Sequence, residues 1–150
     1  MTRLEVTVHG NPAPQGSKRH VGRGIMVESS KTLRPWRDTV AWEARQAKGQ
    51  TPPLTGPVNL NLTFRLVRPK AHYRTGKHHA ELRPDAPTFS PKKPDLDKLC
   101  RAILDALTTA QVWRDDSQVA TLHARKVYAN DNRPPGVDIV VQPLPEGDPA

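Results

Sequence analysis

Regular alternation of apolar and polar residues predicts four strands in this chain. The clearest example is PVNLNLTFRL, in which every second residue from Val58 to Leu66 is apolar and the residues between them are polar. Such a segment buries one face and leaves the other in contact with solvent. The last two strands are joined by the turn NDNRPPG. The predicted strands cover residues 4–8, 57–66, 119–129 and 137–142.

Apolar residues at intervals of three and four predict two helices. The first begins near residues 32–34, because Pro35 is tolerated only in a first turn, and it ends at Gly49. We expect Trp36 and Trp42 of this helix to pack against the protein rather than to stack on nucleic-acid bases. The apolar stripes are Leu33, Trp36, Val40 and Ala44 in the first helix, and Leu96, Leu99, Cys100, Ile103 and Leu107 in the second, at about residues 95–109.

The order strand, helix, strand, helix, strand, strand predicts one small domain of the α/β class, close to α+β, with a mixed sheet and two helices. We assign residues 1–142 to this domain and expect residues 143–150 to form a flexible tail, because they lack core-forming side chains. Within the domain, residues 67–93 contain four prolines and show no regular pattern. An irregular segment of this length is usually functional or disordered.

The chain is strongly basic, with 23 Lys and Arg residues against 15 Asp and Glu residues and a formal net charge of +8. Such an excess attracts polyanions, of which nucleic acid is the commonest. A basic protein without a nucleic-acid role is the alternative. The cations concentrate in residues 10–24 and 67–93. We expect the first segment to be a loop that touches DNA phosphates and the second to be a flexible basic arm that becomes ordered on DNA.

Several other classes of function are disfavoured. No run of about 20 apolar residues could span a membrane, and residues 1–20 lack the apolar centre of a signal peptide. The single cysteine, Cys100, fits a reducing cytoplasm, and its place on an apolar stripe predicts a core residue. Residues 10–18 have the wrong spacing for a phosphate-binding loop, so no nucleotide cofactor is expected. His78 and His79 lack the partners that a histidine-metal nuclease needs.

Acidic residues gather at two places, Asp95 with Asp97 and Asp115 with Asp116. Residues two apart do not face each other within a helix, so Asp95 and Asp97 can converge only if Asp95 lies at the helix cap, where the backbone is extended. One interpretation is structural: Asp95 caps the helix and Asp97 interacts with the helix dipole and with Arg101. In the other, Asp95, Asp97 and Asp116 meet and bind Mg²⁺ or Mn²⁺, the ions that prefer oxygen ligands.

A metal held by carboxylates would favour phosphodiester hydrolysis, because it can lower the pKa of a bound water and offset charge on the leaving oxygen. Arg101, one turn after Asp97, could stabilise charge that develops on the phosphate. An ion pair between Arg101 and Asp97 is the equally simple alternative. The residues themselves leave both questions open.

The segment PDLDKLCRAILDALTTAQVWRDDSQV, residues 94–119, resembles the RusA family of Holliday junction resolvases. The family pattern is Asp-Leu-Asp at the start of a helix, Asp-Ala-Leu near its end, then an aromatic residue and Asp-Asp-x-Gln-Val. The resemblance is dense over residues 94–127 and looser before them, and residues 67–93 do not align. The matching residues are Asp95–Asp97, Asp105–Leu107, Trp113, Asp115–Asp116 and Gln118–Val119.

The resemblance implies a homodimeric, Mg²⁺-dependent endodeoxyribonuclease, of phage or prophage type, that resolves four-way DNA junctions by paired symmetric nicks. Asp95, Asp97 and Asp116 would be the catalytic metal ligands, and Asp115 a further ligand or their neighbour. Arg101 falls where the family has a functional lysine. An arginine keeps the positive charge of that residue but has a different shape, and the resemblance implies a catalytic role for Arg101 on the basis of the charge. The cations expected to bind DNA are Lys18, Arg19, Lys92, Lys93, Lys98 and Lys126.

Two other functions stay open. The protein could be a basic DNA-binding module without catalysis, in which the acids only cap and pair. It could also be a metal-dependent nuclease that acts on flaps or forks.

Overall fold

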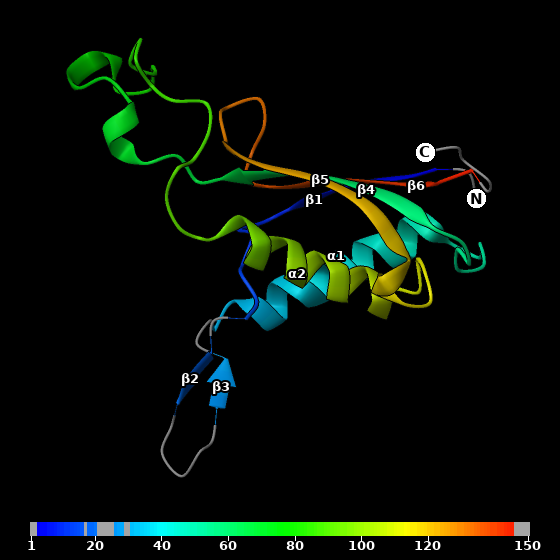
Figure 1. The fold of residues 1–150 in the computed structure, drawn as a ribbon. Coiled ribbons are helices and arrows are strands. Elements are labelled where there is room, and N and C mark those ends of the chain that lie inside the picture. Colours follow the sequence, from blue (N-terminus) through cyan, green and yellow to red (C-terminus); the bar gives the residue numbers. More distant parts are fainter. Residues whose placement is uncertain (1–2, 17, 21–25, 29–30, 146–150) are drawn as a thin grey trace.

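A computed structural model of the chain shows a four-stranded mixed sheet with two helices on one face (Figure 1). The structure describes residues 3–16, 18–20, 26–28 and 31–145. This architecture confirms the predicted class, a single small domain with a mixed sheet and two helices. The strands of the main sheet are β1 (Leu4–His9), β4 (Val58–Leu66), β5 (Val119–Tyr128) and β6 (Gly136–Pro143), and the helices are α1 (Leu33–Lys48) and α2 (Leu96–Thr109).

The sheet has the order β1-β6-β4-β5, in which β4 and β5 are parallel and the other neighbours are antiparallel. Parallel neighbours need a crossover connection, because the chain must return to the edge where the first strand began. Helix α2 makes that return, so its first residues lie near the end of β4 and its last residues lie near the start of β5 (Figure 1). The segments before and after α2 are therefore at opposite ends of the domain.

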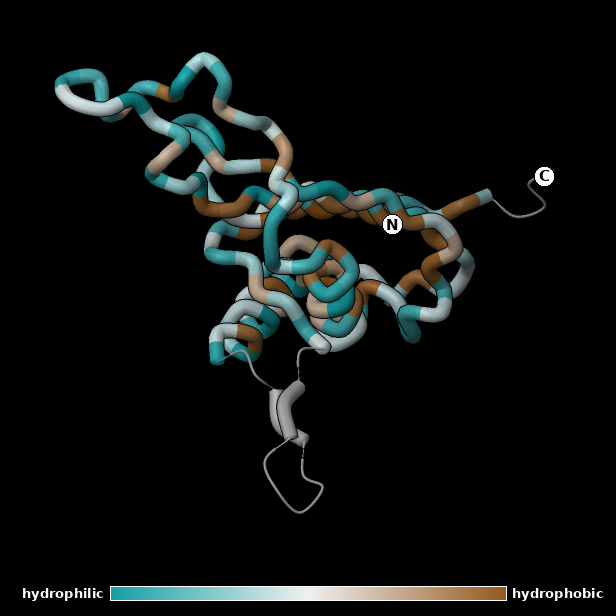
Figure 2. The backbone as a smooth tube through the Cα atoms, turned by 60° about the vertical axis from the view of Figure 1, so that its left-hand side comes forward, coloured by the Kyte–Doolittle hydropathy of each residue, from teal (hydrophilic) through white to brown (hydrophobic). Residues whose placement is uncertain are grey.

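The core lies between the sheet and the two helices, where buried apolar side chains of both layers meet. Figure 2 colours much of the sheet and parts of both helices as hydrophobic. Trp36 is buried, as predicted, and so is Cys100, whose pKa is raised to about 11 by burial and by the charge of Asp97. The prediction that Trp42 packs against the protein is wrong, because its side chain is 58% exposed. Trp42 lies two residues from both Val40 and Ala44 and so points away from the buried side of α1.

Two segments are more ordered than the sequence indicates. The region predicted as a loop at residues 10–24 contains strand β2 (Lys18–His20), which pairs with β3 (Met26–Glu28) as a small antiparallel sheet. Three-residue strands are too short to show an alternating pattern, which is why they escaped prediction. Residues 67–93, called the arm from here on, contain the 3-10 helices η1 (Lys70–His72) and η2 (Gly76–His78).

The base of the arm is fastened to the sheet. Ser90 donates its backbone N–H to the carbonyl of Lys126 (3.2 Å), and Tyr128 donates to the carbonyl of Thr88 (2.9 Å). Arg68 lies over the ring of Tyr128, 5.1 Å from its centroid, and adds a cation–π contact at the other side of the base. The arm therefore leaves and rejoins the body beside the end of β5.

At the C-terminal end, β6 continues one residue past its predicted limit, to Pro143, and Leu144 donates its N–H to the carbonyl of Pro57 (2.9 Å). These residues of the predicted tail are thus held against the sheet. Residues 146–150 lie outside the described residues. Among the described residues, none of the helices has the length and apolar character to cross a membrane.

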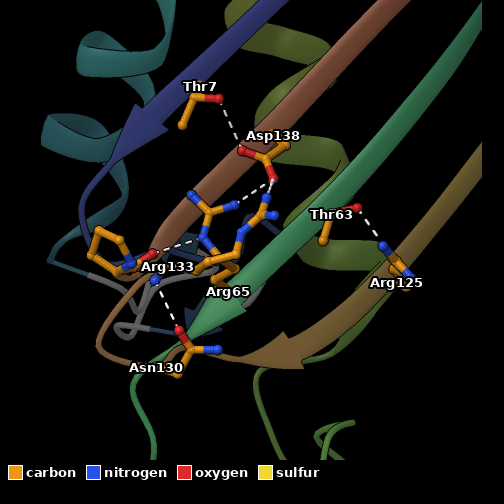
Figure 3. A network of polar contacts seen from close by, with 8 residues as sticks. Thr7, Thr63, Arg65, Arg125, Asn130, Arg133 and Asp138 are labelled. Atoms are coloured by element: carbon orange, nitrogen blue, oxygen red, sulfur yellow. Dashed lines mark hydrogen bonds and ion pairs between the residues drawn. The ribbon is translucent and has the colours of Figure 1, made fainter.

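The face of the sheet opposite the helices carries a polar network centred on Asp138 (Figure 3). Its carboxylate accepts hydrogen bonds from the buried Arg65 (2.5 Å), from Arg133 (2.8 Å) and from Thr7 (3.0 Å). Burial acts to raise the pKa of Asp138, but the hydrogen bonds and the two positive charges outweigh it, so the pKa is lowered. The network neutralises an arginine that would otherwise be buried with an unpaired charge.

We expect Asp138→Asn to lower the free energy of unfolding by about 2 to 3 kcal/mol at pH 7, because Arg65 loses its counter-charge. A carboxyl group with a lowered pKa stabilises the fold above its unfolded pKa of about 3.9, and this contribution is lost as the pH falls through the folded value. The difference between wild type and variant should therefore shrink below about pH 4. Urea unfolding at pH 7 and pH 3 tests this, with the exposed Asp131→Asn as control, and an equal difference at both pH values would contradict it.

Candidate active site around helix α2

Asp95 occupies the position that the sequence predicts. It is the N-cap residue of α2, and its backbone is extended, with φ −69° and ψ 137°. Its side chain makes no capping hydrogen bond, so the structural interpretation, in which Asp95 caps the helix, is not supported. The carboxylate instead lies 3.4 Å from the ammonium of Lys98, in an exposed ion pair. Such a pair contributes little to stability, which leaves Asp95 available for another role.

Asp97 lies in the first turn of α2 and is exposed. It forms no hydrogen bond and no ion pair with any residue that the structure describes, Arg101 included. The guanidinium of Arg101 lies instead against Gly16, where a Cβ atom would overlap Nη1. The alternative of an ion pair between Asp97 and Arg101 is therefore not seen among the described residues. Neither acid of the Asp-Leu-Asp motif makes a capping hydrogen bond with the described residues, but Asp97 lies in the first turn, where its charge interacts favourably with the helix dipole, so that part of the structural interpretation stays open.

Asp115 and Asp116 have different surroundings. Asp115 caps the 3-10 helix η3 (Asp116–Gln118): its carboxylate accepts the N–H of Ser117 (3.1 Å), and Gln118 accepts the N–H of Asp115 (3.0 Å). Asp116 is exposed, and its pKa is raised by partial desolvation, by a hydrogen bond with Asp115 and by the charges of Asp115 and Asp105. Of the two, Asp115 caps η3, whereas Asp116 is exposed and has no capping role.

The three predicted ligands do not meet within one chain. Asp95 precedes α2 and Asp116 follows it, and a helix of 14 residues is about 21 Å long. The charges that act on Asp116 are those of Asp115 and Asp105, not those of the Asp-Leu-Asp motif. Across the described part of the chain, no group of three or more His, Cys, Asp or Glu residues is placed to hold a metal ion. The expectation of a three-carboxylate cluster within one chain is thus corrected, because the α2 crossover separates its members.

The loop before β2 lies across α2, a contact that the sequence did not indicate. Gln15 donates its backbone N–H to the carbonyl of Lys98 (3.0 Å), and its side chain bridges Arg37 of α1 (2.8 Å) and Asp105 of α2. Gly16 follows with φ +105°, a conformation that favours glycine, and leaves room for Arg101. In the sequence, this contact is marked only by Gln15 and Gly16, which stand before the first cation of a segment that we interpreted as a basic loop.

The predicted DNA-binding cations fall into three groups. Lys92 and Lys93 are exposed, and Lys93 lines a shallow hollow of about 350 Å³ together with Asp95 and Lys98. The ammonium of Lys126 is partly buried and donates to the carbonyls of Lys92 (2.6 Å) and Pro94 (2.8 Å), so it fastens the segment that leads into Asp95. Lys18 and Arg19 lie in β2, and their side chains are outside the described residues.

The sequence of the chain is similar to those of known proteins. Residues 9–142 match the family described as Endodeoxyribonuclease RusA. A curated protein of Bacillus subtilis (strain 168), the uncharacterized protein YqaN, is 30% identical over 147 residues, which cover 95% of this chain and 97% of that protein. The family match begins at the last residue of β1 and includes the loop across α2, the arm and both pairs of acids. The chain therefore belongs to the RusA family of endodeoxyribonucleases.

Proposed function

We propose that this protein is a Mg²⁺-dependent endodeoxyribonuclease that resolves four-way DNA junctions by paired symmetric nicks. The observation that carries the proposal is the state of Asp95 and Asp97. Both are exposed at the start of α2, neither makes a side-chain capping hydrogen bond with the described residues, and both belong to a chain with a net charge of +8. Exposed carboxylates beside many cations, one in a weak ion pair and the other with no hydrogen bond or ion pair among the described residues, fit a site that handles phosphate and a hard metal ion.

The chemistry divides between the ion and the chain. Carboxylate oxygens suit Mg²⁺ or Mn²⁺, and a bound ion would lower the pKa of a water and stabilise charge on the leaving oxygen. The residues of the chain bind and orient the DNA: Lys92 and Lys93 lie just before Asp95 and can contact the backbone phosphates on either side of the cleaved bond. Arg101, on the same helix face as Asp97, can neutralise charge that develops on the phosphate.

A homodimer gives the separation of the acids a functional reason. A four-way junction is nearly two-fold symmetric, and its resolution needs one nick in each of two opposed strands, which suits a two-fold pair of small domains. In such a pair, the Asp95 and Asp97 of one subunit can be joined by the Asp116 of the other. Each site would then form only in the assembled dimer. From the family resemblance, we further propose that the protein acts in the bacterial cytoplasm, as an enzyme of phage or prophage type.

Incubation with labelled four-way junctions tests the proposal. We expect paired nicks in opposed strands with Mg²⁺ or Mn²⁺ and intact DNA with a chelator. Fork and flap substrates run in parallel decide the substrate class. Faster cleavage of flaps than of junctions would favour a nuclease that acts on flaps or forks. Tight binding without any cleavage would favour a DNA-binding module without catalysis.

A further inference from the structure

The arm encloses a hollow of about 880 Å³ that lies apart from the acids of α2. The ionisable side chains in its lining are Lys70, Tyr73, Arg74, His79 and Arg83, of which all but the tyrosine are basic or can be protonated. The whole arm carries seven Lys and Arg residues against two acids. Figures 1 and 2 show that the arm projects from the body and is mostly hydrophilic.

The hollow is built by the backbone of the arm itself. Arg74 donates its N–H to the carbonyl of Glu81 (2.8 Å), and Arg83 donates to the carbonyl of His72 (2.9 Å). A bridge between Tyr73 and Leu82 joins the two sides of the turn. These bonds give the lining residues a fixed frame and place the half-buried ring of Tyr73 among the cations. The arm therefore has a defined concave surface, although its sequence shows no periodic pattern.

The cations of the hollow are available for a polyanion. Arg74 pairs with Glu81 (2.8 Å) and Arg83 pairs with Asp85 (3.6 Å), but both pairs are exposed, and exposed pairs contribute little and exchange easily. Lys70 is exposed and makes no side-chain hydrogen bond or ion pair with the described residues. Cations that surround an aromatic ring are the usual platform for single-stranded nucleic acid, in which phosphates contact the cations and a base stacks on the ring.

We propose that the hollow of the arm binds a short unpaired segment of DNA, with phosphates on Lys70 and Arg83 and one base stacked on Tyr73. This inference rests on the proposed function, in which the substrate is branched DNA, and it adds a site outside the catalytic acids. The arm ends at residue 93, two residues before Asp95, so the same segment that forms the hollow leads into the proposed cleavage site. The arm thus selects junctions that contain an unpaired stretch near the crossover.

Fluorescence anisotropy with labelled oligothymidylate and with a duplex of equal length, in chelator, tests the site without cleavage. We expect Tyr73→Leu to weaken oligothymidylate binding about tenfold, because stacking is lost, and to change duplex binding less than twofold. The double variant Lys70→Gln/Arg83→Gln should also weaken oligothymidylate binding. It should lower the slope of log affinity against log salt concentration by about 1.4, because two phosphate contacts are lost. The control Lys77→Gln removes a charge from the same arm outside the lining and should have less than a twofold effect.

Three results would overturn the inference: unchanged oligothymidylate binding by both variants, an equal loss of duplex binding in Tyr73→Leu, or displacement of the oligonucleotide by polyglutamate at equal charge concentration. The last result would indicate an acidic protein as the ligand. Junction cleavage by the wild type with Mg²⁺ is measured separately. If the wild type cuts no junction but the anisotropy pattern holds, the proposed function fails and the arm site stands. If cleavage occurs and the variants bind as the wild type does, only the arm site fails.

Discussion

Asp97→Asn is expected to abolish junction cleavage while junction binding persists. The substitution keeps the size of the side chain but removes the charge that would hold a divalent ion, and we expect the rate to fall about a thousandfold or more, which corresponds to roughly 4 kcal/mol. The fold should not change, because Asp97 has no hydrogen bond or ion pair with the described residues. The measurement is cleavage of a labelled junction with Mg²⁺ together with a gel-shift assay in chelator. Asp131→Asn, an exposed acid in the turn between β5 and β6, is the matched control.

Mixing this variant with Asp116→Asn tests how the site is assembled. Alone, each variant should be inactive. If each site takes Asp97 from one subunit and Asp116 from the other, a mixed dimer contains one intact site and one doubly altered site, and co-expression yields single nicks instead of paired ones. If each site forms within one chain, no mixed dimer has an intact site. A complete lack of nicking by mixed dimers would therefore contradict the shared site, whereas wild-type activity of Asp97→Asn would contradict the catalytic role itself.

Lys126→Met has the second largest expected effect, and it acts through stability and positioning. The ammonium of Lys126 donates to the carbonyls of Lys92 and Pro94, directly before Asp95. Loss of these charged hydrogen bonds should lower the free energy of unfolding by about 2 to 3 kcal/mol and the melting temperature by about 5 to 10 °C. A small displacement of Asp95 should lower the cleavage rate by about tenfold to a hundredfold.

The salt dependence of DNA binding separates this role from a phosphate contact. A lysine that neutralises one phosphate changes the slope of log affinity against log salt concentration by about 1 when it is removed. We expect the slope of Lys126→Met to equal that of the wild type, because two of the donors of Lys126 are already used within the protein. Arg125→Met, on the neighbouring residue, is the control: Arg125 is exposed, and among the described residues its side chain donates only to Thr63 (3.2 Å). If Lys126→Met reduced the salt slope and left the stability unchanged, Lys126 would instead contact DNA directly.

Much of the local structure could be predicted because it depends on near neighbours along the chain. The alternation in β4 fixes which side chains face the helices, and the spacing of apolar residues fixes the buried sides of α1 and α2. The cap position of Asp95 followed from the same local argument, since two residues at that spacing can converge only across a helix start. Trp42 is exposed because of its angular position on α1, two residues from both Val40 and Ala44, which its residue type does not reveal.

The arm and the β2–β3 sheet could not be predicted in this way. Their hydrogen bonds join residues that follow no period, such as Arg74 with Glu81 and Arg83 with His72. Proline-rich sequence excludes long helices and central strands but does not exclude a set of turns that satisfies its own backbone groups. A basic, irregular composition therefore gave the charge of the arm but not the positions of its turns.

By itself, the amino-acid sequence determined the class of the fold, the basic surface and the acids that any metal chemistry would use, because these depend on residue type and on local spacing. Only the tertiary structure decided where those acids lie. Strands β4 and β5 are parallel, so α2 must run back between them and holds Asp95 and Asp116 at its opposite ends. It also decided that Gln15 and Lys126 fasten the two segments beside the acids, since hydrogen bonds between distant parts of the chain leave no periodic trace in the sequence.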